Sequence, residues 1–510
     1  MFSIKYLKIA VLLAVAALLL FACFACDSNN INNSSNNSRD GGPDGQDGEN
    51  SGENPAELII ERPHIPEDTD YGGYEFKVLR PHSYIGEHFD DEVYAEHETG
   101  EPLNDAIYKR NKIAEDLLNI KIRSVTADAG TQQVAGYARK IIQAGSDEFD
   151  AVIGANWTHI ELVRARCLMN LYNIPNMDIS KQWWDQRAIE EMSYKKSKLY
   201  YISGDIMYYD KYGIGIVYFN KRLFVDNGLE YPYVKAKNGA WTLDEFSSLI
   251  KNFSRDLNGD GKMDENDQWG MVENTGAVYH FLIGCGEKTV TLDADGIPVI
   301  NTISDRHIQV VEALGALFSD QNNTLLAGSK QLSHIANPYN DGIFKVFREG
   351  RALMFFEMIG TIPEFRDMED DFGLLPLPKF DESQKNYHSF TSYGWATSYS
   401  VPVTNGDPAR TGMILEVMAG YSSDTIIPAL IDVSLKSKFA RDEESAEMLQ
   451  IIFDTKTYDL GVDYNWGNLY GVYSEVAQNG FSKFVSSMEK QIPRAESDME
   501  KVIDLFEELD

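Results

Sequence analysis

Residues 256–267 have the composition and spacing of a loop that binds a divalent cation. Their sequence, DLNGDGKMDEND, places carboxylate or amide oxygens at the first, third and fifth positions and glycine at the sixth, where the chain must turn sharply. The predicted ligands are the side chains of Asp256, Asn258, Asp260, Asp264 and Asp267, and the main-chain carbonyl of Lys262. Asp267 stands where an EF-hand has glutamate, and its side chain is shorter. The spacing favours a structural Ca²⁺ over the alternative, a solvated acidic turn.

A second chemical feature lies at the N-terminus, where Cys23 closes a long apolar run. Residues 20–23 (LFAC) resemble the bacterial lipobox, in which the cysteine is acylated and becomes the new N-terminus. Lys5 and Lys8 precede the apolar run, so residues 1–22 are predicted to be a secretory signal peptide rather than a membrane-spanning helix. Cys26 is the alternative acylation site.

The segment after the lipobox cannot form a core. Residues 23–56 are rich in Asn, Ser, Gly and Asp, which is typical of a flexible tether. We therefore predict a lipidated tether and an extracytoplasmic chain that is lipid-anchored to the cell membrane.

Signatures of enzymes are weak in the remainder of the chain. The nine histidines form no HExxH motif, and no Walker loop or G-x-S-x-G motif is present. Acid pairs such as Glu191 with Asp205 could serve a glycosidase, but 79 acidic residues make chance pairs common. Cys167 and Cys285 have apolar neighbours. The sequence is compatible either with two buried free thiols or with one disulfide between them. We predict that the protein is not an enzyme.

The composition excludes several other classes of protein. The 46 basic and 79 acidic residues give a formal charge of −33, which disfavours binding to nucleic acids or to anionic lipid surfaces. Hydrophobic residues make up 43% and aromatic residues 12%, so most of the chain should fold. A length of 510 residues is sufficient for two or three domains.

Strand and helix patterns alternate from residue 57 onward. Strands are predicted at 74–79, 120–125 and 149–154, with helices at 103–118 and 134–144 between them. This order predicts a parallel sheet with helices on both faces. Later helices are expected at 303–319 and 339–349, a buried strand at 351–356, and two C-terminal helices, 481–491 and 495–509, separated by Pro493.

Several phrases in the body of the chain resemble those of the bacterial extracellular solute-binding proteins of family 1. They are 218–224 (YFNKRLF) with 228–229 (GL) and 241–242 (WT), 347–352 (FREGRA), 372–379 (FGLLPLPK), 439–445 (FARDEES) and 458–461 (YDLG). Each phrase is short, but they occur in the correct order, and the resemblance runs from about residue 74 to 467.

The resemblance implies an α/β, periplasmic-binding-protein-like fold with two lobes, an interleaved chain and a hinge. Lobe one would contain residues 57–209 plus 351–400, and lobe two residues 211–350 plus 401–510. It also implies a small solute, most often a sugar or oligosaccharide, that is captured between the lobes and delivered to the permease subunits of an ABC importer.

Sugar sites combine aromatic faces with carboxylates or amides, and this criterion selects the predicted ligand-binding residues. Some follow the strand 149–154 or end the strand 351–356, and others lie near the expected hinge crossings or the C-terminus. They are Asn156, Trp157, Tyr208, Tyr209, Asp210, Glu357, Tyr393, Trp395 and Trp466. The alternative for each aromatic residue is ordinary core packing.

Three other functions remain open. A secreted glycan-cleaving enzyme would turn over an oligosaccharide, whereas a receptor of the same fold could bind a peptide or another solute. A surface lipoprotein that senses or adheres is the third alternative.

Overall fold

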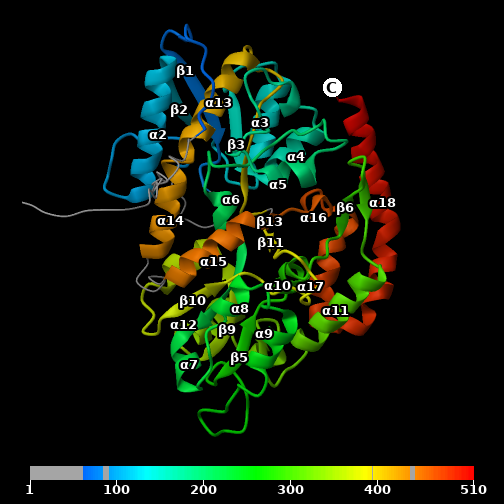
Figure 1. Ribbon diagram of the computed structural model, residues 1–510. Coiled ribbons are helices and arrows are strands. Elements are labelled where there is room, and N and C mark those ends of the chain that lie inside the picture. Colours follow the sequence, from blue (N-terminus) through cyan, green and yellow to red (C-terminus); the bar gives the residue numbers. More distant parts are fainter. Residues whose placement is uncertain (1–60, 84–90, 393, 437–442, 510) are drawn as a thin grey trace, which may run out of the picture. The chain divides into compact units, whose positions relative to one another are not determined.

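The computed structural model describes residues 61–83, 91–392, 394–436 and 443–509 (Figure 1). The predicted signal peptide, the tether, Cys23, Cys26 and Tyr393 lie outside these residues.

A four-stranded sheet forms the centre of lobe one, with strand order β12-β3-β1-β2. Strands β1 (Tyr74–Arg80), β2 (Ile120–Thr126) and β3 (Ala151–Ala155) are parallel, and β12 (Thr397–Ser400) runs antiparallel to β3. Phe76, Val78 and Leu79 of β1 are completely buried in the core of this lobe. The three predicted strands are therefore confirmed.

Helices pack on both faces of this sheet (Figure 1). The chain supplies α3 (Val134–Gln143), α4 (Asn156–Arg164) and α5 (Gln186–Met192) between the strands. Helix α2 (Pro102–Leu118) contacts β2 as well as α13 (Pro408–Ser422) and α14 (Ile426–Lys436), which come from late in the sequence.

A five-stranded mixed sheet forms the centre of lobe two, with strand order β10-β4-β9-β5-β8. Its strands are β4 (Gly215–Asn220), β5 (Trp269–Glu273), β8 (Thr324–Leu326), β9 (Ala352–Met358) and β10 (Phe372–Leu375).

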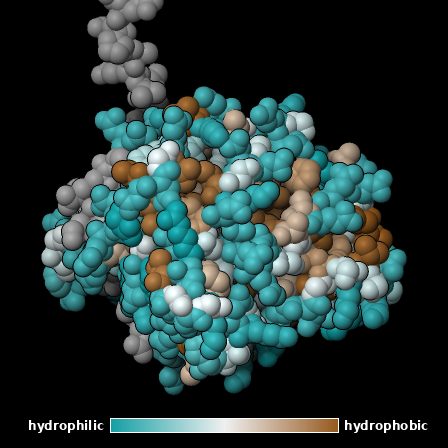
Figure 2. Space-filling model, turned by 90° about the horizontal axis from the view of Figure 1, so that it is seen from below, coloured by the Kyte–Doolittle hydropathy of each residue, from teal (hydrophilic) through white to brown (hydrophobic). Residues whose placement is uncertain are grey.

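The helices of lobe two surround this sheet. They are α7 (Lys221–Asp226), α8 (Tyr233–Lys237), α9 (Leu243–Ile250), α10 (Ala277–Gly284), α11 (Asp305–Phe318), α12 (Lys345–Arg348) and α15 (Glu443–Asp454). The side chain of Thr242 caps α9 by accepting the Glu245 N–H. Figure 2 shows a face of the molecule that is mostly hydrophilic, with hydrophobic side chains in separate patches.

The structure differs from the predicted lobe boundaries in two places. Strand β9 pairs with β4 and β5, so the segment that starts at residue 351 belongs to the sheet of lobe two. Helices α13 and α14 pack on α2, so residues 408–436 belong to lobe one. A short apolar run predicts a buried strand but does not specify its neighbours, because partners are set by tertiary packing.

The C-terminus forms one helix instead of the two that Pro493 predicts. Helix α18 (Phe484–Glu508) runs through Pro493, and its residues Met488 and Ala495 are buried on either side of it. Gly467 lies against Ala495 so closely that a Cβ atom at Gly467 would be 2.7 Å from it. Packing of one continuous apolar face thus offsets the roughly 3 kcal/mol that an internal proline costs.

Cys167 and Cys285 are both free and buried, which answers the question that the sequence left open. Among the described residues, no single helix has the length and apolar composition needed to cross a membrane, although α13 and residues 426–433, bent by 41°, meet the criterion as a pair.

Candidate functional site

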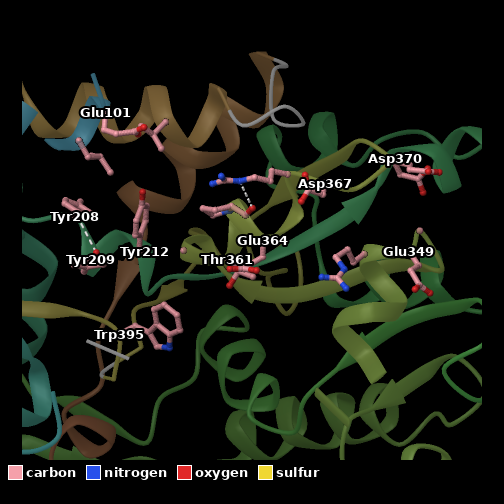
Figure 3. Close-up of a pocket in the computed structure, with 18 of the residues that line it drawn as sticks. Glu101, Tyr208, Tyr209, Tyr212, Glu349, Thr361, Glu364, Asp367, Asp370 and Trp395 are labelled. Atoms are coloured by element: carbon pink, nitrogen blue, oxygen red, sulfur yellow. Dashed lines mark hydrogen bonds between the residues drawn. The ribbon is translucent and has the colours of Figure 1, made fainter. Parts of the chain in front are cut away.

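A cavity of about 1340 Å³ lies between the two lobes (Figure 3). Four of the aromatic residues that the structure describes line it where the chain crosses between the lobes: Tyr208, Tyr209, Tyr212 and Trp395. Three of these were predicted from the sequence as ligand-binding residues, and the structure brings them together. Typical small-molecule pockets measure roughly 300–1,000 Å³, so this cavity has room for a ligand larger than a single sugar ring.

The tyrosines belong to the crossing segment 208–214, which contains the short helix α6 (Tyr209–Tyr212). The ring centroids of Tyr208 and Tyr209 are 4.6 Å apart, and Tyr212 meets Tyr209 edge-on at 5.7 Å. These distances are typical of favourable aromatic pairs. The cluster therefore forms an apolar surface at the hinge side of the cavity.

Glycine allows the second crossing segment, residues 391–392 and 394–396, to approach the first. A Cβ atom added to Gly213 would be 2.8 Å from the Cβ atom of Trp395. The Ser392 N–H also donates to the Gly213 carbonyl at 2.9 Å. The absence of a side chain at Gly213 thus places Trp395 beside the tyrosines.

A buried carboxylate joins both crossing segments. One oxygen of Glu92 accepts the backbone N–H groups of Tyr208 at 2.7 Å and Tyr209 at 2.9 Å. The other oxygen accepts the hydroxyl of Thr397 at 2.9 Å. Burial raises the pKa of Glu92 to about 7, although these hydrogen bonds act in the opposite direction. Glu92 thereby holds the start of α6 and the start of β12.

Lobe one supplies one wall of the cavity, mainly from the first turn of α2. Glu101 precedes this helix, and Leu103 and Asn104 follow within its first turn. Val433 of α14 completes the wall.

Lobe two supplies the opposite wall, which is strongly charged. The 3₁₀ helix η4 (Ile359–Phe365) and the residues after it follow β9, and they contribute Thr361, Glu364, Arg366, Asp367, Glu369 and Asp370. Arg222 donates to Asp370 at 2.6 Å and to the Gly350 carbonyl at 2.9 Å. The hydrogen bond to Asp370 raises the pKa of Arg222.

Buried ion pairs involve Asp210 and Lys211 of α6. Asp210 is completely buried, and its carboxylate accepts from Lys211 at 3.1 Å and from Lys456 at 2.8 Å. Lys456 also forms an ion pair with Asp185 of lobe one. Asp210, a predicted ligand-binding residue, is thus placed in the interior and not on the cavity wall.

Two further predicted residues lie at the carboxyl end of β3, away from the cavity. Asn156 is buried, donates to Asp463 at 3.1 Å and accepts the hydroxyl of Ser398 at 2.7 Å. Trp157 is half-buried, and its indole N–H donates to the Thr131 carbonyl at 3.2 Å. Burial raises the pKa of Asp463 to about 7.

Glu357 and Trp466 also lie in the interior. Glu357 accepts the hydroxyl of Tyr339, and burial raises the pKa of this carboxyl group. Trp466 is fully buried and stacks on Tyr464 with a centroid distance of 5.6 Å. Their aromatic and acidic types match those of a sugar site, but these contacts are typical of a packed core.

The loop 256–267 is folded around its own backbone amides. Asp256 accepts the Gly261 N–H at 2.9 Å, and Asp267, which is fully buried, accepts the Leu257 N–H at 2.9 Å. Within the part of the chain that the structure describes, no three or more His, Cys, Asp or Glu side chains converge in a geometry that could hold a metal ion. Calcium binding by this loop stays a prediction.

The sequence reasoning missed Tyr212, Glu101 and the charged residues of η4. A signal for η4 was present, because the segment directly follows the buried strand β9, and ligands bind at the carboxyl ends of sheet strands. Its glycine and proline, Gly360 and Pro363, mark a turn at that position. Glu101 carries no comparable signal in the sequence.

Comparison with solved structures identifies the fold. The chain is similar to a sugar transporter from Rhizobium etli in an open conformation, at 14% identity and a TM-score of 0.56, with 82% of this chain and 99% of that chain covered. It is also similar to the galacto-N-biose-/lacto-N-biose I-binding protein of the ABC transporter from Bifidobacterium longum, in complex with lacto-N-biose. There the identity is 12% and the TM-score 0.52, with 82% of this chain and 98% of that chain covered.

A third similar structure is the maltose-binding periplasmic protein MalE from Listeria monocytogenes in complex with maltose. The identity is 13% and the TM-score 0.52, with 86% of this chain and 98% of that chain covered. No family model and no curated protein matches the sequence. The chain has the two-lobed α/β fold of the periplasmic binding proteins, as the sequence predicts.

Proposed function

We propose that this protein is the solute-binding component of an ABC importer, and that it captures a sugar or oligosaccharide between its lobes. The observation that carries the proposal is the cavity of about 1340 Å³ between the lobes, with aromatic rings at the crossing segments and polar side chains on both walls. The similar proteins from Rhizobium etli, Bifidobacterium longum and Listeria monocytogenes are named as sugar-binding or sugar-transporting proteins, which supports the same solute class.

The side chains of the cavity suit a carbohydrate. Tyr212 and Trp395 offer aromatic faces against which the C–H surface of a pyranose can pack. Asn104, Thr361 and Glu364 offer amide, hydroxyl and carboxylate groups that can hydrogen-bond to sugar hydroxyls. Contacts of both kinds from two lobes bind a saccharide only when the lobes are close together.

Capture requires no bond chemistry. A ligand that touches both walls favours the closed arrangement by its differential affinity for closed over open. The importer then distinguishes the loaded from the empty receptor by the arrangement of the lobes. The two lobes hold the saccharide between them, and it is released to the importer chemically unchanged.

The N-terminal segment supports a position next to a membrane importer. Acylation of Cys23, or of Cys26, would anchor the chain, and the tether of about thirty residues would give an r.m.s. reach of roughly 30 Å. The folded body could then meet the permease subunits without leaving the membrane surface.

Thermal unfolding in the presence of saccharides tests the proposal. Mono- and oligosaccharides would be added singly to the mature protein. A ligand at about 100 times its Kd stabilises the folded state by ~2.7 kcal/mol. Over the roughly 450 residues of the folded unit this corresponds to a Tm increase of about 3 °C, because unfolding entropy is ~2.1 cal/mol/K per residue.

Two tryptophan variants locate the site. We expect Trp395→Ala to abolish the ligand-induced shift, whereas Trp157→Ala, whose side chain does not line the cavity, should retain it. The opposite pattern would move the site to the carboxyl end of β3. No shift with any saccharide would contradict the carbohydrate proposal, and a shift with peptides instead would favour a peptide receptor.

A separate measurement tests the alternative of a glycan-cleaving enzyme. The protein would be incubated with every oligosaccharide that raises its Tm, and the mixture would be analysed for shorter products. We expect stoichiometric binding without turnover. Sustained release of shorter products would overturn the proposed receptor function.

A further inference from the structure

The charges of the cavity wall are unbalanced. Among the residues that the structure describes, six carboxylates and three arginines line it. The acids are Glu101, Glu349, Glu364, Asp367, Glu369 and Asp370, and the arginines are Arg222, Arg348 and Arg366. The described residues that line the cavity therefore carry a net formal charge of −3.

Part of this charge is neutralised within the wall. Asp370 is paired with Arg222, and Glu349 is paired with Arg351, which lies outside the cavity lining. Among the described residues no ion pair is formed by the carboxylates of Glu101, Glu364, Asp367 and Glu369.

The unpaired acids come from both lobes. Glu101 belongs to the α2 side of the cavity, whereas Glu364 and Asp367 belong to the η4 side (Figure 3). The side chains of Glu101, Glu364 and Asp367 are exposed in this arrangement. Carboxylates on opposing walls repel one another more strongly as the lobes approach, because the distance between like charges and the water between them both decrease. A neutral ligand leaves this repulsion in place, whereas a positive charge between the walls converts it to attraction.

The net charge of the whole protein also favours a cationic ligand. With a net charge of −33, the chain attracts cations, and a cleft lined by one sign of charge focuses that field. The aromatic rings of Tyr212 and Trp395 at the base of the cavity suit a saccharide, and a ring face also attracts a cation.

We propose that the ligand of this cavity is a cationic saccharide, that is, a sugar or oligosaccharide that carries protonated amino groups. This inference rests on the proposed function and names its substrate class. The aromatic base would pack against the sugar rings, while Glu101, Glu364 and Asp367 would contact the ammonium groups from both walls.

Isothermal titration with saccharides matched at one position provides the test. The β-1,4-linked tetramers of glucosamine, N-acetylglucosamine and glucose differ at carbon 2, which carries an ammonium, an acetamide or a hydroxyl group. The corresponding monosaccharides form a second matched set. We expect the glucosamine compounds to bind more tightly than their partners in at least one set.

Salt distinguishes the attraction of charges from other causes of selectivity. The Debye length falls from roughly 30 Å at 0.01 M to roughly 3 Å at 1 M ionic strength. The affinity for the glucosamine compound should therefore fall as salt is added. Selectivity that is unchanged by salt would contradict the inference.

Charge-removing variants test the location. Glu364→Gln and Asp367→Asn should each weaken glucosamine binding about two- to fivefold, the effect of losing a partly exposed ion pair. Glu382→Gln is the matched control, because Glu382 is an exposed acid that does not line the cavity and its loss changes the net charge equally. Equal weakening in the control would assign the preference to the overall charge and overturn the assignment to the cavity.

The outcomes separate this inference from the proposed function. If a neutral saccharide from the Tm screen binds and no cationic saccharide binds more tightly, the receptor function stands and the cationic preference is wrong. If no saccharide of either kind binds, the receptor function itself fails, and the inference fails with it.

Discussion

The buried carboxylate of Glu92 predicts a specific dependence of stability on pH. Glu92 lies at the base of the hinge, where it accepts two backbone N–H groups of α6 and the hydroxyl of Thr397. Replacement by glutamine in Glu92→Gln removes the charge but keeps an oxygen for both N–H groups and adds an amide donor for Thr397. The variant therefore tests the buried charge with little change in geometry.

The magnitude follows from the two pKa values of the carboxyl group. Burial raises the pKa of Glu92 from 4.5 to about 7 in the folded protein. The folded state then holds its proton over a range in which the unfolded state loses it. The contribution of Glu92 to the free energy of unfolding is greatest below pH 4.5 and falls as the pH rises to about 7, by ~1.4 kcal/mol per pH unit and about 3 kcal/mol in total. Because Glu92→Gln does not titrate, it should be more stable than the wild type above pH 7.

Thermal unfolding at pH values from 4.5 to 8 measures this effect. About 3 kcal/mol corresponds to a Tm difference of roughly 3 °C for a folded unit of this size. We expect the Tm of Glu92→Gln, relative to the wild type, to rise by that amount across the range. Comparing the two proteins cancels the titration of all other groups that they share.

A second buried acid provides an independent test of the same effect. Burial raises the pKa of Glu416 in α13 to about 7 as well, and its carboxylate accepts from the Trp184 indole at 2.8 Å. Glu416→Gln should show the same trend in Tm, because the physical cause is the same. A Tm difference between Glu92→Gln and the wild type that does not change with pH would refute the reasoning about the buried charge.

Three further results are expected. Lys456→Met should lower the free energy of unfolding by about 3–5 kcal/mol, measured by thermal unfolding, because Asp185 and Asp210 lose the cation that they share; a Tm within 1 °C of the wild type, on the order of the noise in such melts, would count against it. A chelator should lower the Tm of the wild type but not that of Asp256→Ala if residues 256–267 hold calcium; identical melts would argue for a solvated turn. Mass spectrometry of membrane-extracted protein should find the acyl groups on Cys23, and Cys23→Ser should release the protein from membranes unless Cys26 is the acylated residue.

The local elements of lobe one could be predicted because each depends on its own stretch of sequence. Alternating apolar residues in 74–79 and 120–125 become β1 and β2, and the helical spacing of 103–118 becomes α2. These patterns depend on burial of one face, which the sequence records directly.

Membership of a sheet could not be predicted in the same way. The residues of β9 are buried on both faces, so they fit the interior of either sheet equally well. Similarly, Pro493 is a local signal to end a helix, but the packing of α18 on both sides of it is a tertiary effect. Both differences arise where distant contacts outweigh a local preference.

The candidate site shows the same division. Strand ends and hinge crossings could be located, and they led to Tyr208, Tyr209 and Trp395. Residue type alone did not separate these from Trp466, since a buried tryptophan and a cleft tryptophan look alike in a sequence.

The geometry of the cavity depends on a contact that no local pattern contains. Glu92 lies 116 residues before Tyr208, yet its carboxylate holds the first turn of the segment that presents the tyrosines. The same carboxylate accepts the hydroxyl of Thr397, which lies 305 residues after Glu92 and shortly after Trp395. One buried acid therefore fixes both crossing segments to lobe one. The 3₁₀ helix η4 follows β9 of lobe two and packs against α6, so the charged wall reaches the buried carboxylate of Glu92 through the crossing segments.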